Sequence, residues 1–293
     1  MKLSHLLCGA AMATAALWGV PANAAAINLD GYVGSLAIDF HNYESFGNLG
    51  PNNSLQVGST NYGVFNILGI TAQQNSGSIS AGQTIWTPGG SNGYLVGVFS
   101  GITVTSITGS GTTFHTGNSG GTFEIYQVSS FPSFSQGTAG YTTGGCTVVG
   151  GTCYNGITNV SGHTNPILTA KLIAGADTTN PLDTLYSTES TTTVPLSGSA
   201  TGFLDITGGT DAYEFGRDGY NTATGGLADL TLLDNFCTNA AGCSGATNPI
   251  GNWNELSNDP IGATAVPEPS TFGLLGAALV MIGWVGLRRR KQA

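Results

Sequence analysis

Short apolar segments, separated by Gly, Asn, Pro and Ser, run through the middle of the chain. In "FEIYQV", Phe123 and Ile125 alternate with Glu124 and Tyr126, and both faces of the segment are partly apolar. A period of two with β-branched and aromatic residues is typical of β-strands. The pattern predicts strands at Tyr32–Phe40, Tyr62–Thr71, Tyr94–Thr108, Thr122–Ser129, Ile167–Ala174, Gly202–Thr207 and Leu227–Leu233.

These strands predict an all-β ectodomain over residues 25–262. Roughly 240 residues suffice for one large all-β domain or two small ones. No segment before Ser270 has the period of an amphipathic helix, and Ser129–Gly145 and Asp177–Thr193 have the composition of long loops. The predicted fold is a β-sandwich, with jelly-roll-like connections as a variant.

The N-terminus has the pattern of a secretory signal peptide. It begins Met1-Lys2, is apolar over Leu6–Val20 and reaches small residues at Ala22 and Ala24. A short cationic start, an apolar stretch and an Ala-x-Ala site predict a signal peptide over residues 1–24, cleaved after Ala24.

The C-terminal apolar run, Phe272–Leu287, predicts a single transmembrane helix over residues 271–287. At the helical rise of 1.5 Å per residue the run spans about 24 Å, which suits a thin membrane when terminal arginines snorkel. Pro269 stands just before the helix, where proline costs least. The basic tail, residues 288–291, is expected to stay cytoplasmic and to leave the ectodomain outside.

Positive charge is scarce in the body of the chain. The whole sequence has 7 Lys and Arg against 16 Asp and Glu, and its formal net charge is −9. Lys2 lies in the signal peptide and four cations lie in 288–291, which leaves Lys171 and Arg217 for the ectodomain. Nucleic acid is therefore excluded as a partner, because its binding needs clustered Lys and Arg.

So acidic a body repels an acidic polysaccharide at neutral pH. Binding would require a divalent cation that bridges carboxylates, which is the expected route, or neutral contacts such as aromatic stacking. Aromatic side chains of strands belong more often to the core or the strand surface. Those available for stacking are Trp86, Trp253, Tyr94, Tyr141, Tyr154, Tyr213 and Tyr220.

Four cysteines remain once the signal peptide has removed Cys8. An even number in an exported chain predicts disulfides, with three allowed connectivities. Local pairing across two hairpins, "CTVVGGTC" and "CTNAAGC", is favoured because opposed strand positions suit disulfide geometry. The predicted bonds are Cys146–Cys153 and Cys237–Cys243. Zinc is disfavoured because neither spacing is C-x-x-C and no histidine stands nearby.

The segment "GNSGG" resembles the loop around the nucleophile of trypsin-like serine proteases, with Ser119 in that position. The chemistry needs a histidine base held by a buried carboxylate. His41 lacks the flanking residues of that family, and no aspartate lies between His41 and Ser119. His115 lies in the same predicted turn as Ser119. A glycine-rich turn is the preferred interpretation.

The segment "LDITGGTDAYEFGRDGYN" holds weak candidates for a Ca²⁺ site, because acidic residues in glycine-rich loops supply the oxygen ligands that Ca²⁺ prefers. The candidates are Asp205, Asp211, Glu214 and Asp218. Their spacing fits neither an EF-hand loop nor the nonapeptide repeat. Arg217 is an alternative partner for one of them, so solvated loop charge is preferred, and no metal or other cofactor is predicted.

The C-terminal segment, residues 263–293, resembles the PEP-CTERM sorting signal of Gram-negative bacteria. Its three parts are "VPEP" at 266–269, the short apolar helix and the Arg-rich end. The resemblance implies recognition by an exosortase, an integral-membrane cysteine protease. It implies a precursor in the inner membrane and a mature form at the cell surface or in the extracellular matrix. The implied recognition residues are Val266, Pro267, Glu268, Pro269, Arg288, Arg289 and Arg290.

The blocks "GYLVGVFSG", "GTFEIYQV", "PILTAKLIAG" and "GFLDITGGTDAYEF" resemble flocculation-associated PEP-CTERM proteins in their order and glycine placement. The predicted function is therefore a structural or adhesive role in exopolysaccharide, biofilm or floc formation, without catalytic activity. The alternative is a secreted hydrolase that acts on extracellular polymer.

Processing of the tail is the first testable prediction. Mass spectrometry of the mature surface protein is expected to find a C-terminus near Pro267–Pro269, because a plain anchor needs no such triplet. A mature surface form that still ends in Arg288–Ala293 contradicts the sorting interpretation and leaves a simple membrane anchor.

Overall fold

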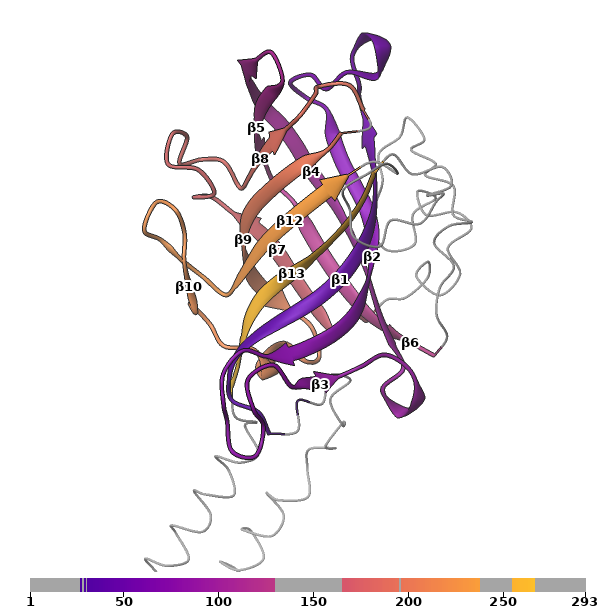
Figure 1. Cartoon of the computed structure of the whole chain (residues 1–293), viewed down its shortest axis with the longest axis vertical. Helices are drawn as coiled ribbons and strands as arrows, with labels where there is room; N and C mark the ends of the chain where they lie inside the picture. Colours follow the sequence, from indigo (N-terminus) through magenta and orange to yellow (C-terminus); the bar gives the residue numbers. More distant parts are fainter. Residues whose placement is uncertain are drawn as a thin grey trace, which may run out of the picture.

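The computed structural model describes residues 27, 29, 31–129, 165–194, 196–237 and 255–266, drawn in colour in Figure 1. These residues form β-strands and short 3-10 turns without an α-helix, which confirms the predicted all-β class. The strands are β1 (Gly34–Gly47), β2 (Thr60–Ala72), β3 (Thr84–Trp86), β4 (Tyr94–Ser110), β5 (Thr113–Ser119), β6 (Thr122–Val128), β7 (Leu168–Ile173), β8 (Leu185–Glu189), β9 (Gly198–Gly208), β10 (Tyr220–Asn221), β11 (Leu227–Ala228), β12 (Leu230–Cys237) and β13 (Glu255–Ala265). The turns are η1 (Pro51–Asn53), η2 (Gly90–Asn92) and η5 (Ala212–Glu214).

The long strands pair in one antiparallel sheet that closes on itself. Its order is β3-β2-β1-β13-β12-β9-β7-β6-β4-β5-β8, with additional pairings of β2 with β4 and of β9 with β8. Because β2 pairs with β4 on one side and with β1 on the other, the strands surround a common interior (Figure 1). Strands β10 and β11 form a separate small ribbon.

In two places, two short strands lie end to end along the same long strand. Strands β5 and β6 lie consecutively along β4, with Ser119 opposite Thr103 and Thr122 opposite Ser100. The backbone between them has positive φ at Gly120 and Gly121, a conformation that glycine adopts without strain. Strands β7 and β8 likewise both pair with β9. Many neighbours in the ring are therefore close along the chain, whereas β5 pairs with β8 and β13 returns to β1.

The predicted β-sandwich, with or without jelly-roll connections, is wrong, because the described long strands form one closed sheet and not two packed sheets. A period of two indicates which residues face the interior, but it does not identify the strand that lies alongside. The predicted loop Asp177–Thr193 contains β8, and β13 was not predicted at all. β13 also continues beyond residue 262, where the ectodomain was expected to end.

Phenylalanine rings fill the middle of the enclosed space. Phe99 and Phe123 stack with centroids 5.5 Å apart, and Phe40 meets Phe65 edge-on at 5.9 Å. All four belong to the main core or pack against it. Glycines opposite the rings make room for them, because a Cβ at Gly97 would overlap the ring of Phe65.

A smaller apolar cluster lies at the end of the sheet near β5 and β8. The segment before β2 and the segment before β9 are joined there by hydrogen bonds from Leu55 N to Thr192 O, 2.8 Å, and from Val194 N to Asn53 O, 2.9 Å. The cluster consists of Leu55, Val194, Leu196, Ala200 and Phe236. The interior is therefore capped by apolar side chains at this end.

Several predictions lie outside the described residues. They include the signal peptide with Ala22 and Ala24, the bond Cys146–Cys153 and the helix at 271–287. No helix among the described residues is long and apolar enough to cross a membrane. Cys237 ends β12, its predicted partner Cys243 is not described, and no disulfide is found in the described part of the chain.

Replacing Gly97 by alanine tests the fit between glycine and phenylalanine inside the sheet. The added methyl group would overlap Phe65, and such overpacking costs about 1–3 kcal/mol. The free energy of unfolding, measured with denaturant, is expected to fall by that amount, and Phe65→Leu in the same chain is expected to restore part of it. Gly69→Ala on β2 is the matched control, because its Cβ finds no atom closer than 3.7 Å. Equal losses in both alanine variants would contradict the account.

Candidate functional site

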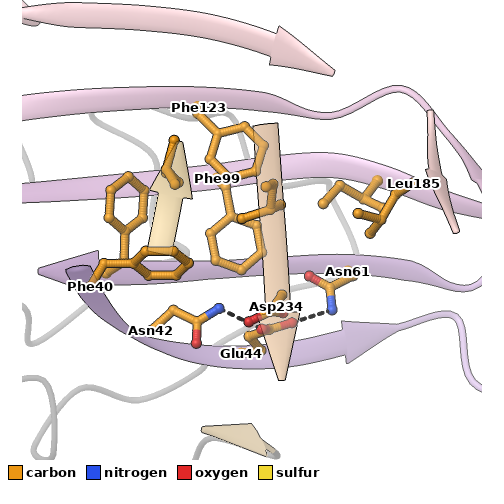
Figure 2. Close-up of a pocket in the computed structure, with 12 residues that line it drawn as sticks. Phe40, Asn42, Glu44, Asn61, Phe99, Phe123, Leu185 and Asp234 are labelled. Atoms are coloured by element: carbon orange, nitrogen blue, oxygen red, sulfur yellow. Dashed lines mark hydrogen bonds between the residues drawn. The ribbon is translucent and has the colours of Figure 1, made fainter. Parts of the chain in front are cut away.

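Next to the phenylalanine rings the interior of the sheet becomes polar (Figure 2). Strand β1 continues its inward-facing positions from Phe40 through Asn42 to Glu44, and both polar side chains are buried. A cavity of about 40 Å³ lies here. Its lining is Phe40, Asn42, Glu44, Asn61, Phe65, Phe99, Ile102, Phe123, Leu185, Leu232, Asp234 and Ile261.

Amide side chains hold Glu44 in place. Asn42 Nδ2 donates to Glu44 Oε1 at 2.5 Å, and Asn61 Nδ2 donates to Oε2 at 2.6 Å (Figure 2). Asn42 Oδ1 in turn accepts from the backbone N–H of Ser257 at 2.9 Å. Three strands, β2, β1 and β13, are thereby linked through one buried carboxyl group.

A second polar group lies on the inner face of β5 and β8. Thr116 Oγ1 and Ser187 Oγ donate to Glu189 Oε1 at 2.9 and 2.5 Å. Asn118 Nδ2 donates to Thr116 Oγ1 at 3.2 Å and to the backbone of Leu185 at 3.2 Å. These side chains line a second cavity of about 40 Å³. It shares Glu44, Asn61, Ile102, Leu185 and Asp234 with the first.

We call these residues the interior polar layer: Asn42, Glu44, Asn61, Thr116, Asn118, Ser187, Glu189 and Asp234. Three of them are acids, and among the described residues no Lys, Arg or His lines either cavity. Burial raises the pKa of Glu44 and of Glu189, although hydrogen bonds from the amide and hydroxyl donors act in the opposite direction. Ionisation of both groups is therefore less favourable in the folded protein than in water.

Hydrogen-bond acceptors exceed donors in the layer. Glu189 is only 3% exposed, and its Oε2 accepts no hydrogen bond within the described structure. The same holds for Asn61 Oδ1, whose amide nitrogen is engaged with Glu44. Buried acceptors without donors are costly. The layer is therefore suited to a guest that donates hydrogen bonds.

The protease-like constellation is not formed by the described residues. His115 Nδ1 lies 3.0 Å from the hydroxyl of Thr188, and its ring stacks on Tyr186 with centroids 5.5 Å apart. Ser119 ends the same strand, four positions further along an extended chain. His41 belongs to β1, where it lines a surface hollow with Asp39.

The weak Ca²⁺ candidates make separate contacts. Asp205 stands opposite Lys171 in the register of β9 and β7, and Asp211 Oδ2 accepts the backbone N–H of Ile27 at 2.8 Å. Glu214 is buried in η5. Asp218 lies beside the ion pair of Arg217 with Asp229, at 2.7 Å. No three His, Cys, Asp or Glu side chains in the described ranges are arranged to hold a metal ion.

The aromatic residues considered for stacking on sugars differ in how much of the side chain is exposed. Trp86 is 2% exposed and belongs to the main core, so the stacking role offered for it is wrong. Tyr213 is 41% exposed near η5. Trp253, Tyr141 and Tyr154 lie outside the described residues. Tyr186, which stacks on His115, was missed because its strand was predicted to be a loop.

The last described residue, Val266, is fixed to the body. Its backbone N–H donates to Glu214 O at 3.0 Å, directly after β13 has paired Ala265 with Gly34 of β1. The Pro-Glu-Pro triplet begins at the next residue of the sequence. The structure thus provides no spacer between the sheet and the triplet.

A family model of the PEP-CTERM protein-sorting motif matches residues 265–291. No curated protein and no solved structure matches the chain. The chain therefore carries a PEP-CTERM sorting motif at residues 265–291, and this motif marks an exported protein of Gram-negative bacteria, whose membrane-anchored precursor an exosortase processes. The match spans all the sorting residues expected from the sequence, Val266 to Pro269 and Arg288 to Arg290.

The buried acids generate a prediction about pH. The pKa of Glu189 is raised above its ordinary 4.5, so its contribution to stability is complete below pH 4.5 and is lost as pH rises through the folded value. Glu189→Gln does not titrate. Thermal unfolding across a pH series is expected to show that the Tm of the variant, relative to that of the wild type, rises from acidic to neutral pH. Asp218→Asn, on an exposed loop, is the control. A difference in Tm between Glu189→Gln and the wild type that is the same at every pH would contradict the raised pKa of Glu189.

Proposed function

We propose that the mature protein is a non-catalytic, adhesive component of the extracellular matrix in biofilm or floc formation. It contacts polysaccharide through the outer face of β5, β8, β9 and β12. The stacked pair of His115 and Tyr186 carries this proposal. Export and processing follow from the sorting motif, whereas the adhesive role is inferred from the chemistry of this face.

Two rows of side chains make up the face. In the first, residues opposite one another in the strand register are Thr108, His115, Thr188, Ser199 and Asn235. In the second they are Tyr186, Thr201 and Leu233. The rows hold hydroxyls, an amide and two rings, and Leu233 is 50% exposed. Aromatic faces flanked by small polar groups suit the apolar faces and hydroxyls of sugar rings.

The charge of the face supports the same proposal. Neither row contains Asp, Glu, Lys or Arg, although the chain has a net charge of −9. One carboxylate, that of Asp183, lies over Gly117 at the β5 end of the second row, opposite Tyr186. The rest of the two rows carries no charged side chain and lets an acidic protein approach a polymer, including an acidic one, with less repulsion than a charged surface would. Of the two routes considered from the sequence, neutral contact is therefore favoured over cation bridging.

The hydrolase alternative has less support. Its natural location would be the interior polar layer, where carboxyl groups converge. Those groups line cavities of about 40 Å³ each, whereas sites for substrates of even drug size measure about 300–1,000 Å³. A polymer segment needs an open cleft, so we base the proposal on the outer face.

Tyr186→Ala tests the proposed face. Loss of a ring contact of about 0.5–1.5 kcal/mol is expected to weaken retention of the purified mature protein on the polysaccharide of its own bacterium about two- to tenfold. Tyr213→Ala removes an exposed ring elsewhere and serves as the control. Thermal unfolding of both variants checks that each is folded.

Chelator and salt separate this mechanism from cation bridging. Neutral contact is expected to survive chelator and to strengthen slightly as salt screens the remaining repulsion. Binding that chelator abolishes, or that the two tyrosine variants weaken equally, would refute the assignment to this face.

A further inference from the structure

We propose that the interior polar layer is a binding site for a small protonated amine, whose ammonium group donates hydrogen bonds to Glu189 and Asn61. This site lies inside the closed sheet, on the opposite side of the strands from the polysaccharide face. The inference therefore goes beyond the proposed adhesive function and does not depend on it.

Hydrogen bonding selects a donor as the guest. Glu189 Oε1 already accepts from Thr116 and Ser187, but the buried Oε2 accepts none in the described structure. Asn61 Oδ1 is equally buried and without a donor there. Both side chains line the second cavity. An ammonium group carries up to three N–H donors and no acceptor, so it satisfies these atoms without adding another unpaired one.

Charge selects a cation. Glu44, Glu189 and Asp234 all line the second cavity, and the described lining residues include no Lys, Arg or His. A cation in the cavity would favour the ionised form of these carboxyl groups, which burial disfavours. A neutral donor such as water would supply the hydrogen bonds but not the charge.

Size limits the guest to a few non-hydrogen atoms. Each cavity measures about 40 Å³, and the two adjoin through their shared lining residues. Ile102 and Leu185 belong to both linings, and the rings of Phe99 and Phe123 lie beyond them in the first. A methyl or short alkyl group would rest against this apolar side while the ammonium group meets the acceptors. An aromatic cation–π contribution is consistent with that placement.

A metal ion fits less well than an amine. Three carboxyl groups, two amides and two hydroxyls line the second cavity, but no three acids in the described residues are arranged for metal coordination. Both oxygens of Glu44 are already engaged by amide N–H groups. Coordination of Ca²⁺ commonly takes six to eight oxygens, which the remaining acceptors do not provide.

Thermal unfolding with methylammonium chloride tests the site. The purified mature protein at neutral pH is expected to show a rise in Tm that grows with concentration, because a ligand bound only by the folded state stabilises it. Tetramethylammonium chloride at equal ionic strength is the ligand control, since it has the charge but no N–H donor. It is expected to give no specific rise.

Glu189→Gln is the matched variant, because it keeps the shape of the side chain and replaces the unused acceptor and its charge. We expect its apparent affinity for methylammonium to be at least about tenfold weaker than that of the wild type. Asp218→Asn removes an acid from an exposed loop and is expected to leave the response unchanged. Calorimetric titration of the wild type requires no variant and is expected to saturate at one methylammonium per chain.

Four results would overturn the proposal. They are a calorimetric titration without saturation, an equal Tm rise with tetramethylammonium, an undiminished response in Glu189→Gln, and a larger, chelator-sensitive rise with Ca²⁺. The last would assign the interior polar layer to a metal. None of them bears on retention by polysaccharide, so failure here is distinguishable from failure of the adhesive function.

Discussion

Pairing of β2 with β4 is the constraint on which the rest of the structure depends. It converts a sheet with two edges into a ring, and every second side chain of each long strand must then share one enclosed space. Inside that space, large side chains lie opposite glycines, which have no side chain. Gly63 lies opposite Phe99 and Gly97 opposite Phe65, so the rings lie where two side chains could not coexist.

The same enclosure explains why the interior polar layer is unusual. A carboxyl group at the end of an open sheet would simply face water, but Glu44 and Glu189 lie between the phenylalanine core and the cluster around Leu55. Glu44, through Asn42 and Asn61, joins β1, β2 and β13, and Glu189 joins β5 and β8 through Thr116. Such a network fixes the relative positions of strands more tightly than apolar contacts do, at a cost in desolvation that the apolar core must offset.

Much of the sheet was predictable from the sequence because apolar alternation persists in β2, β4, β6, β7 and β9. β1 was predicted to stop at Phe40, since its inward positions then change to Asn42 and Glu44 and the apolar period disappears. The polar layer was missed for that reason. The sequence of β13, "ELSNDPIGATA", has a weak strand pattern and contains Pro260. This segment becomes a strand because it pairs with β1 on one side and with β12 on the other. The sorting motif was accessible from sequence because it is a contiguous signal that requires no knowledge of the fold.

The position of β13 has a consequence for the order of events during export. The strand that completes the ring is the last to be synthesised, and it directly precedes the segment that signals to the membrane. Until it arrives, β1 and β12 present open edges, and their closure joins residues more than 200 positions apart, such as Gly34 and Ala265. Because β13 directly precedes the sorting motif, the sheet closes only once the chain up to that motif is available. A chain that stops before β13 would leave the edges of β1 and β12 unpaired, and unpaired strand edges favour association with other chains, whereas β13 covers both edges.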